Sequence, residues 1–133
     1  MGAARYSEDG GSSMTSVAII GLGAAADHIH LPAYATLRGQ VLVVGACDPD
    51  AQARQRAHRK WNVPVFEDPV QMLRQVNPEV VTVCMPPALH RDHALLALSK
   101  GCHVFCEKPV AETLEQADEI VSAAEVASRF GWW

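Results

Sequence analysis

Two glycines behind a short apolar run constrain this chain more than any other feature. Residues 17–26 read Val-Ala-Ile-Ile-Gly-Leu-Gly-Ala-Ala-Ala. This order is typical of a buried strand that enters a tight turn and then a helix. Gly21 permits the sharp turn, Gly23 has no Cβ to block close backbone approach, and Ala26 is small enough for the helix to pack on a sheet. The positive end of that helix is therefore expected to face an anion such as a pyrophosphate.

An acidic residue at the end of the next apolar run extends the pattern. Asp48 lies 25 residues beyond Gly23, near the spacing of roughly 20 residues at which a carboxylate can accept hydrogen bonds from the adenine ribose of a dinucleotide. Asp48 also suits the cap of a following helix, and the two roles are compatible. Arg54 is the nearby cation that could reach a 2′-phosphate, but Asp48 would repel that phosphate. The spacing therefore predicts a dinucleotide site that prefers NAD to NADP.

Composition limits the remaining function classes. The 133 residues suffice for one domain with a sizeable core, with 49% apolar and 20% charged residues. The net charge is −4, and the basic residues gather only at 54–60, as on the solvated face of a helix, so nucleic acid is not expected as the main ligand. No apolar segment approaches the roughly 18 residues that span a bilayer. The first thirteen residues lack the apolar core of a signal peptide.

The four cysteines all lie in or beside strand-like runs. Buried free thiols suit a reducing cytoplasm, which is the compartment we expect. A metal site at Cys102, His103 and Cys106 is not expected, because side chains alternate along a strand and His103 would point away from both thiols.

Strand-like and helix-like runs alternate along the chain. We expect a disordered leader at residues 1–13 and one folded domain at residues 14–133. Strands are expected at 17–20, 41–47, 63–66, 79–85 and 102–106, and helices at about 25–37, 51–61, 70–76, 90–100 and 113–128. Such alternation predicts a doubly wound parallel α/β sheet in three layers, with a ligand crevice at the carboxyl ends of the strands.

Two helices carry more specific signals. Pro32 is expected to kink or delimit the first helix, because it lacks an N–H and crowds the preceding turn. Thr113 and Gln116 are expected to form a reciprocal capping box at the start of the last helix. The expected apolar face of that helix consists of Leu114, Ala117, Ile120, Val121 and Ala124.

Three further motifs carry a resemblance to a known family. They are His-Leu-Pro at 30–32, Pro-Pro-Ala-Leu-His at 86–90 and Gly-Cys-His-Val-Phe-Cys-Glu-Lys-Pro at 101–109. With the glycine turn and Asp48, the chain resembles the N-terminal, Rossmann-type domain of the Gfo/Idh/MocA family of NAD(P)-dependent oxidoreductases. This family includes glucose-fructose oxidoreductase and inositol dehydrogenase. The resemblance covers residues 16–128, which is nearly all of the expected fold.

The resemblance implies a role for each matching residue. The pyrophosphate would bind at Gly21, Leu22, Gly23, Ala24, Ala25 and Ala26, and the adenosine ribose at Asp48. Met85, Pro86 and His90 would line the middle of the dinucleotide, and Glu107 and Lys108 would lie near the nicotinamide. Lys108 would be the catalytic residue that supports hydride transfer at a sugar-type or polyol-type secondary alcohol. The peptide bond before Pro109 would be cis, as is frequent in the family.

Simpler interpretations stand beside these roles. Lys108 could equally be an exposed lysine of a loop. His90 could be a polar residue at the start of a helix, and Glu107 could cap the turn that follows it. His28 and His30 are interpreted as packing or helix-start residues, because Asp27 is the only carboxylate beside them in the sequence.

Family members are longer and carry a second domain that supplies the substrate pocket, the usual catalytic base and an oligomer interface. The present chain stops at 129–133, where a sixth strand and that domain would begin. We therefore expect a dinucleotide-binding domain that acts on a sugar or polyol only with a supplied substrate domain, and which turns over very slowly alone. The chain could also form a homo-oligomer. The alternatives are a non-catalytic NAD(P)-binding regulatory module and an inactive truncated product with an exposed aromatic end.

Overall fold

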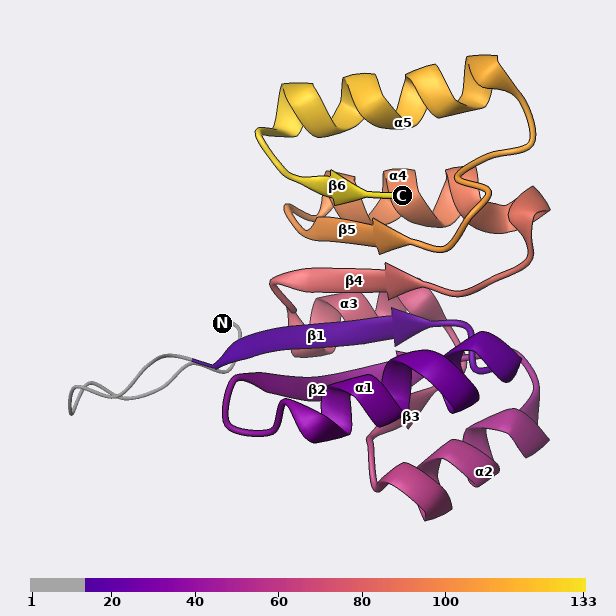
Figure 1. The fold of residues 1–133 in the computed structure, drawn as a ribbon, viewed down its shortest axis with the longest axis vertical. Helices are drawn as coiled ribbons and strands as arrows, with labels where there is room; N and C mark the ends of the chain where they lie inside the picture. The colour runs from indigo at the N-terminus through magenta and orange to yellow at the C-terminus, as the bar shows by residue number, and fades with distance from the viewer. Residues whose placement is uncertain (1–13) are drawn as a thin grey trace, which may run out of the picture.

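The apolar runs form one parallel sheet (Figure 1). The computed structural model describes residues 14–133, and the expected leader at residues 1–13 lies outside the described residues. The strands are β1 (Thr15–Ile20), β2 (Val41–Cys47), β3 (Val65–Phe66), β4 (Val80–Val83), β5 (His103–Cys106) and β6 (Gly131–Trp132). Their spatial order is β3-β2-β1-β4-β5-β6, and every neighbouring pair is parallel. The predicted doubly wound α/β sheet is confirmed, and its strand order reverses between β1 and β4.

Helices cover both faces of the sheet because each crossover between parallel strands is right-handed. One face packs against the turn η1 (Ala26–His30), α1 (Leu31–Thr36) and α2 (Ala51–Trp61). The other packs against α3 (Pro69–Val76), α4 (His90–Ser99) and α5 (Leu114–Ala127). A short 3-10 turn, η2 (Pro87–Leu89), precedes α4. Alternate residues of β1 belong to different cores, since Ala18 and Ile20 pack against the second group and Ile19 against the first.

The first crossover helix is divided before Pro32. Residues 26–30 form a π-helical turn, and the Leu31 N–H closes it by donating to the Ala26 carbonyl. The α-helical part then begins at Leu31, as the proline had predicted. The wider turn fits the chemistry of Pro32, which has no N–H and whose ring would clash with the carbonyl four residues before it.

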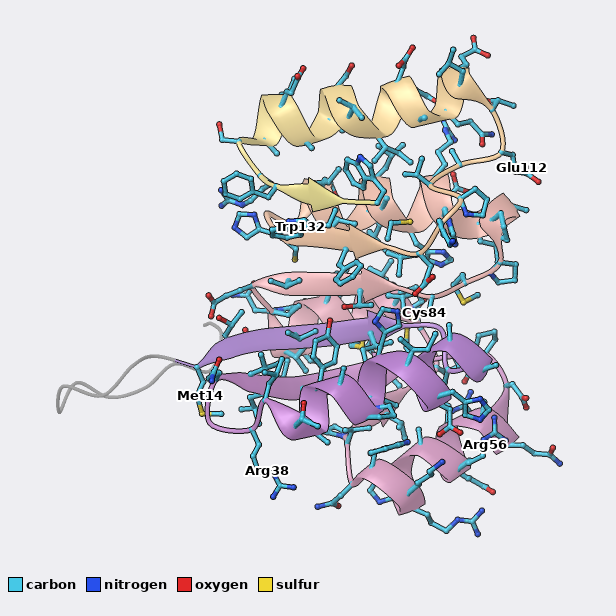
Figure 2. The ribbon with its side chains drawn as sticks, in the orientation of Figure 1. Met14, Arg38, Arg56, Cys84, Glu112 and Trp132 are labelled. Atoms are coloured by element: carbon cyan, nitrogen blue, oxygen red, sulfur yellow. The ribbon has the colours of Figure 1, made fainter. Side chains whose placement is uncertain are left out.

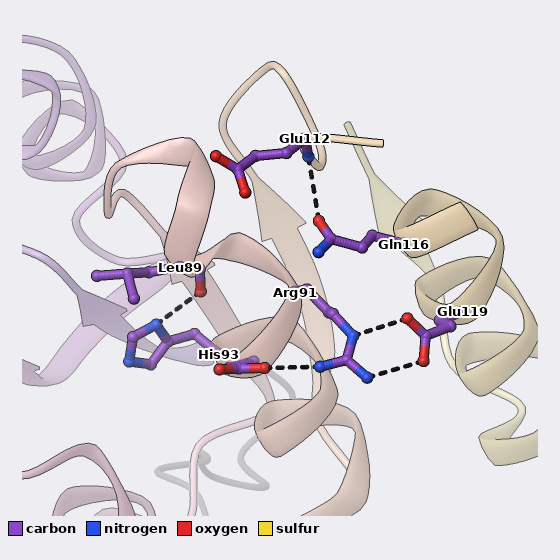
Figure 3. A network of polar contacts seen from close by, with 7 residues as sticks. Leu89, Arg91, His93, Glu112, Gln116 and Glu119 are labelled. Carbon is purple, nitrogen blue, oxygen red and sulfur yellow. Dashed lines mark hydrogen bonds and ion pairs between the residues drawn. The ribbon is translucent and has the colours of Figure 1, made fainter. Parts of the chain in front are cut away.

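The start of α5 differs from the expected capping box. Thr113 Oγ1 accepts the Gln116 N–H at 3.1 Å, as predicted. The Gln116 side chain instead accepts the Glu112 N–H at 3.3 Å, so the reciprocal half of the prediction is wrong (Figure 3). The loop turns back before Thr113 and thereby presents the earlier amide to the side chain.

The apolar face predicted for α5 is also partly wrong. Ile120 and Ala124 are buried, but Leu114 is 80% exposed and Val121 is exposed as well. The helix packs mainly against α4, and Arg91 of α4 forms two hydrogen bonds with Glu119 of α5, at 2.7 and 2.8 Å (Figure 3). One neighbouring helix covers only a narrow line of side chains, so the rest of the predicted face meets solvent.

A sixth strand was expected to begin where the chain stops, at 129–133, and a short one is present there, since Gly131 and Trp132 pair with β5 as β6. Gly131 leaves room for the Trp133 ring, since a Cβ there would lie 1.7 Å from the nearest ring carbon. A two-residue strand has too little periodicity to be recognised without its neighbour.

Candidate dinucleotide site

The glycine turn lies at the point where the strand order reverses. Gly21 has φ +105°, and a Cβ on it would lie 2.8 Å from the Cys84 carbonyl carbon. Its N–H donates to the Cys47 carbonyl at 2.8 Å, which ties the turn to the end of β2. Cys84, labelled in Figure 2, leaves β4 beside the turn and donates its N–H to the Ile20 carbonyl. The turn is thus held between the ends of three strands.

Gly23 faces open space at the same edge. It is exposed, and a Cβ added there would meet no heavy atom of residues 14–133 within 4 Å. Ala24 is exposed and Ala25 half-buried, whereas Ala26 is buried in the core with Leu22. The turn therefore combines a packed side and an open backbone that an anion could approach.

Asp48 is joined directly to the glycine turn. Its Oδ2 accepts the Leu22 N–H at 2.8 Å, and its Oδ1 accepts the Asp50 N–H at 2.8 Å. The cap of α2 is Asp50, whose side chain accepts the Gln52 N–H, so Asp48 is not the capping residue. Each carboxylate oxygen of Asp48 retains capacity for a second donor, such as a ribose hydroxyl.

The nearby cation, Arg54, is engaged with the backbone. Arg54 Nη1 donates to the carbonyls of Asp48 at 2.8 Å and Pro49 at 3.0 Å. The guanidinium thus holds the backbone of the turn into α2. The Asp48 carboxylate itself is bonded to the backbone N–H groups of Leu22 and Asp50.

His90 connects the two other loops of the edge. Its buried ring places Nε2 2.5 Å from the Met85 carbonyl and Nδ1 2.6 Å from the Pro109 carbonyl. Met85 is half-buried and Pro86 exposed, on the loop beside the glycine turn. His90 therefore contacts the protein backbone with both ring nitrogens and fixes the distance between these loops.

The loop after β5 contains the expected catalytic lysine. Lys108 is exposed, and the Lys108–Pro109 peptide bond is cis, as the resemblance implied. Glu107 Oε2 lies 2.5 Å from His30 Nε2, and His30 is only 5% exposed. His30 is buried, as a packing residue would be, and its carboxylate partner lies 77 positions away in the sequence, where inspection of neighbouring residues could not find it. Only the sheet brings the two together.

The cysteines are free, and burial keeps them protonated. Burial, together with the Asp48 charge, raises the pKa of Cys47 to about 12. His103 lies on the opposite face of β5 from Cys102 and Cys106, and its Nδ1 accepts the Phe130 N–H at 2.9 Å. Within residues 14–133, no cluster of three His, Cys, Asp or Glu side chains could hold a metal ion. None of the helices in this range is long and apolar enough to cross a membrane.

The strand order, the packed and open glycines and the nearby acid define a dinucleotide-binding domain of the Rossmann type. Residues 15–131 match the model of the GFO_IDH_MocA family, described as an oxidoreductase family with an NAD-binding Rossmann fold. The chain belongs to this family, and the predicted resemblance is confirmed.

Individual relatives agree with this assignment. Over 118 residues the chain is 47% identical to D-glucoside 3-dehydrogenase of Escherichia coli, covering 85% of this chain and 33% of the relative. It is 34% identical over 112 residues to glucose-6-phosphate 3-dehydrogenase of Bacillus subtilis, and the match covers 84% of this chain and 31% of that relative. The structure of the WlbA dehydrogenase of Bordetella pertussis, solved with NADH and UDP-GlcNAcA, matches with a TM-score of 0.83 at 27% identity. The match covers 87% of this chain and 34% of that protein. The chain thus spans about a third of the length of these relatives.

Proposed function

We propose that this chain binds NAD(H) and forms the cofactor-binding part of a dehydrogenase that oxidises a secondary hydroxyl of a sugar or polyol. The observation that carries the proposal is the glycine turn, closed at Gly21 by Cys84, open at Gly23 and bonded through Leu22 to Asp48. This arrangement offers main-chain donors to a diphosphate and carboxylate acceptors to a ribose. The named substrates of the two curated relatives, both acted on at position 3 of a glucose unit, support the substrate class.

The residues on the open edge then divide into three groups. The turn from Gly21 to Ala26 holds the diphosphate, and Asp48 holds the adenosine ribose. Met85 and Pro86 line the middle of the cofactor, and His90 orders that loop through its buried ring. Glu107 and Lys108 lie at the nicotinamide half, because the second nucleoside crosses the reversal point toward β4 and β5.

Lys108 is the residue proposed to act on the substrate. Its exposed ammonium can donate a hydrogen bond to the reacting oxygen and stabilise the negative charge that forms there when the hydroxyl proton passes to a base supplied by the substrate domain. The cofactor supplies the hydride acceptor, and the chain supplies its orientation.

NAD is proposed in preference to NADP for an electrostatic reason. The Asp48 carboxylate faces the ribose position, and the guanidinium of Arg54 donates to two backbone carbonyls. A 2′-phosphate would therefore meet an anion before it met an available cation.

Calorimetric titration with NADH tests cofactor binding. Asp48→Ala is expected to weaken NADH binding about tenfold or more, because it removes the ribose acceptor and the partner of the Leu22 N–H. Asp50→Ala is the matched control, since it removes a neighbouring carboxylate that only caps α2. Wild-type chain that shows no saturable binding at millimolar NADH contradicts the proposal. Equal weakening by both substitutions contradicts the ribose role of Asp48.

A chimaera tests catalysis. Residues 15–131 replace the matching third of D-glucoside 3-dehydrogenase, and turnover is followed by NADH absorbance with a D-glucoside. Lys108→Ala is expected to lower kcat by about 10²–10⁴-fold while the chimaera still binds NADH, because it removes the hydrogen bond to the reacting oxygen. Lys100→Ala, an exposed lysine at the end of α4, is the control. An active chimaera that is insensitive to Lys108→Ala contradicts the catalytic role.

A further inference from the structure

A buried histidine and a carboxylate meet across the nicotinamide half of the open edge. His30, at the end of η1, places Nε2 2.5 Å from Glu107 Oε2 at the end of β5. The side chains are 7% and 27% exposed. The glycine-turn helix and the Lys108 loop are therefore joined by a direct polar contact.

The surroundings fix the orientation of the histidine. Its ring packs edge-on against Phe105, with centroids 5.4 Å apart, and lies 6.4 Å from the ring of Tyr34. Tyr34 is itself held by a 2.6 Å hydrogen bond between its hydroxyl and Thr82. His30 thus has little freedom to turn away from Glu107.

The position of Glu107 brings its negative charge near the nicotinamide end of a bound cofactor, a step that rests on the proposed function. The end of β5 lies two strand spacings, ~10 Å, from the end of β1 where the diphosphate would bind. This is the span of a nucleoside. Burial, and after it the Glu107 charge, raises the pKa of Cys84 to about 12, so the carboxylate acts electrostatically on the β4 end as well.

The nicotinamide ring is positive when oxidised and neutral when reduced. A nearby carboxylate therefore stabilises NAD⁺ more than NADH. A hydrogen bond from His30 to that carboxylate draws its negative charge toward the core and weakens this preference.

We propose that the His30–Glu107 pair sets the relative affinity of the site for oxidised and reduced cofactor, with His30 restraining the Glu107 carboxylate. Both residues are positioning residues in this role, since they act through charge beside the ring and take no part in bond making.

The test is the ratio of the NAD⁺ and NADH affinities of the full chain, measured by calorimetry. His30→Leu keeps an apolar body against Phe105 and removes the donor, so it is expected to shift the ratio about threefold or more toward NAD⁺. His30→Gln retains an N–H near the position of Nε2 and should restore the wild-type ratio. Glu107→Gln removes the charge and should shift the ratio about threefold or more toward NADH.

The outcomes separate a charge effect from a structural one. Opposite shifts in His30→Leu and Glu107→Gln, with recovery in His30→Gln, support the proposal. Equal loss of both affinities, or an unchanged ratio in Glu107→Gln, overturns it. If the wild-type chain binds neither cofactor, the proposed function fails and the inference fails with it. If the wild-type chain binds NAD⁺ and NADH but the variants leave the ratio of the two affinities unchanged, the inference fails while the proposed function stands.

Discussion

The two glycines of the turn exclude other residue types for different physical reasons. Gly21 needs a positive φ and has the Cys84 backbone where a side chain would be. Gly23 has an ordinary φ and open space around it. One glycine is therefore required by the fold, and the other is proposed to be required by the ligand.

Alanine substitutions at these two glycines should separate stability from binding. Gly21→Ala is expected to destabilise the domain by about 2 kcal/mol or more, through strain in φ and a clash with Cys84. Gly23→Ala should leave stability within about 0.5 kcal/mol and weaken NADH binding instead, because the new methyl group occupies the diphosphate approach. Urea unfolding and NADH titration of both variants check this. Similar NADH affinity in wild type and Gly23→Ala is the contradicting outcome.

At the scale of elements, one carboxylate joins η1 to the end of α2. Asp27 accepts the Trp61 indole N–H at 2.9 Å and a Lys60 ammonium hydrogen bond at 3.2 Å, and His28 Nε2 lies 3.3 Å away. The Trp61 hydrogen bond is the largest cause of a pKa of Asp27 below its ordinary value of 3.8. A lowered folded pKa means that the ionised carboxylate stabilises the fold above pH 3.8 and loses this effect as the pH falls through the folded pKa.

Asp27→Asn should therefore show a pH-dependent defect. The variant is expected to be less stable than wild type by about 1 kcal/mol at pH 7, where the native side chain is ionised and bonded to Trp61. The difference should narrow as the pH is lowered below 3.8. Thermal unfolding of both proteins between pH 7 and acid checks the trend, and a difference that stays constant with pH contradicts it.

The contact between α4 and α5 explains why part of the predicted apolar face of α5 is exposed. Arg91 and Glu119 form a bidentate pair on the surface, and Arg91 also donates to Asp92 at 3.0 Å (Figure 3). The pair sets the contact between two helices whose apolar faces meet only along a narrow line. This is why the α5 sequence pattern overstated the buried face.

For the molecule as a whole, the uneven cover of the sheet is the main feature. Among residues 14–133, no helix covers β5 and β6 on the η1 and α1 face, whereas the other half of the sheet is covered there. Aromatic side chains are exposed along this part of the molecule, from Phe105 at 38% to Phe130 at 67%. The exposed aromatic surface consists of Phe105, Phe130, Trp132 and Trp133.

This surface should make the chain self-associate. Because exposed apolar patches next to an edge strand favour contacts between copies, the sedimentation coefficient is expected to rise with protein concentration. Trp132→Lys should reduce this rise, since it places a charge in the middle of the patch. Leu42→Lys, at an exposed apolar position on β2, is the control. Sedimentation that is independent of concentration, or unaffected by Trp132→Lys, contradicts the prediction.

The sequence alone determined the parallel sheet, the glycine turn and the order of the elements, because these depend on local periodicity and on residues close together in the chain. It also placed Asp48 correctly after β2. Only the tertiary structure decided the contacts between distant residues: Asp48 with Leu22, His30 with Glu107, and the pairing of β6 with β5. The two side-chain contacts arise where parallel strands bring separate loops to one edge, and the pairing of β6 arises where the chain returns beside β5. No periodicity within a single segment records which of these distant segments will meet.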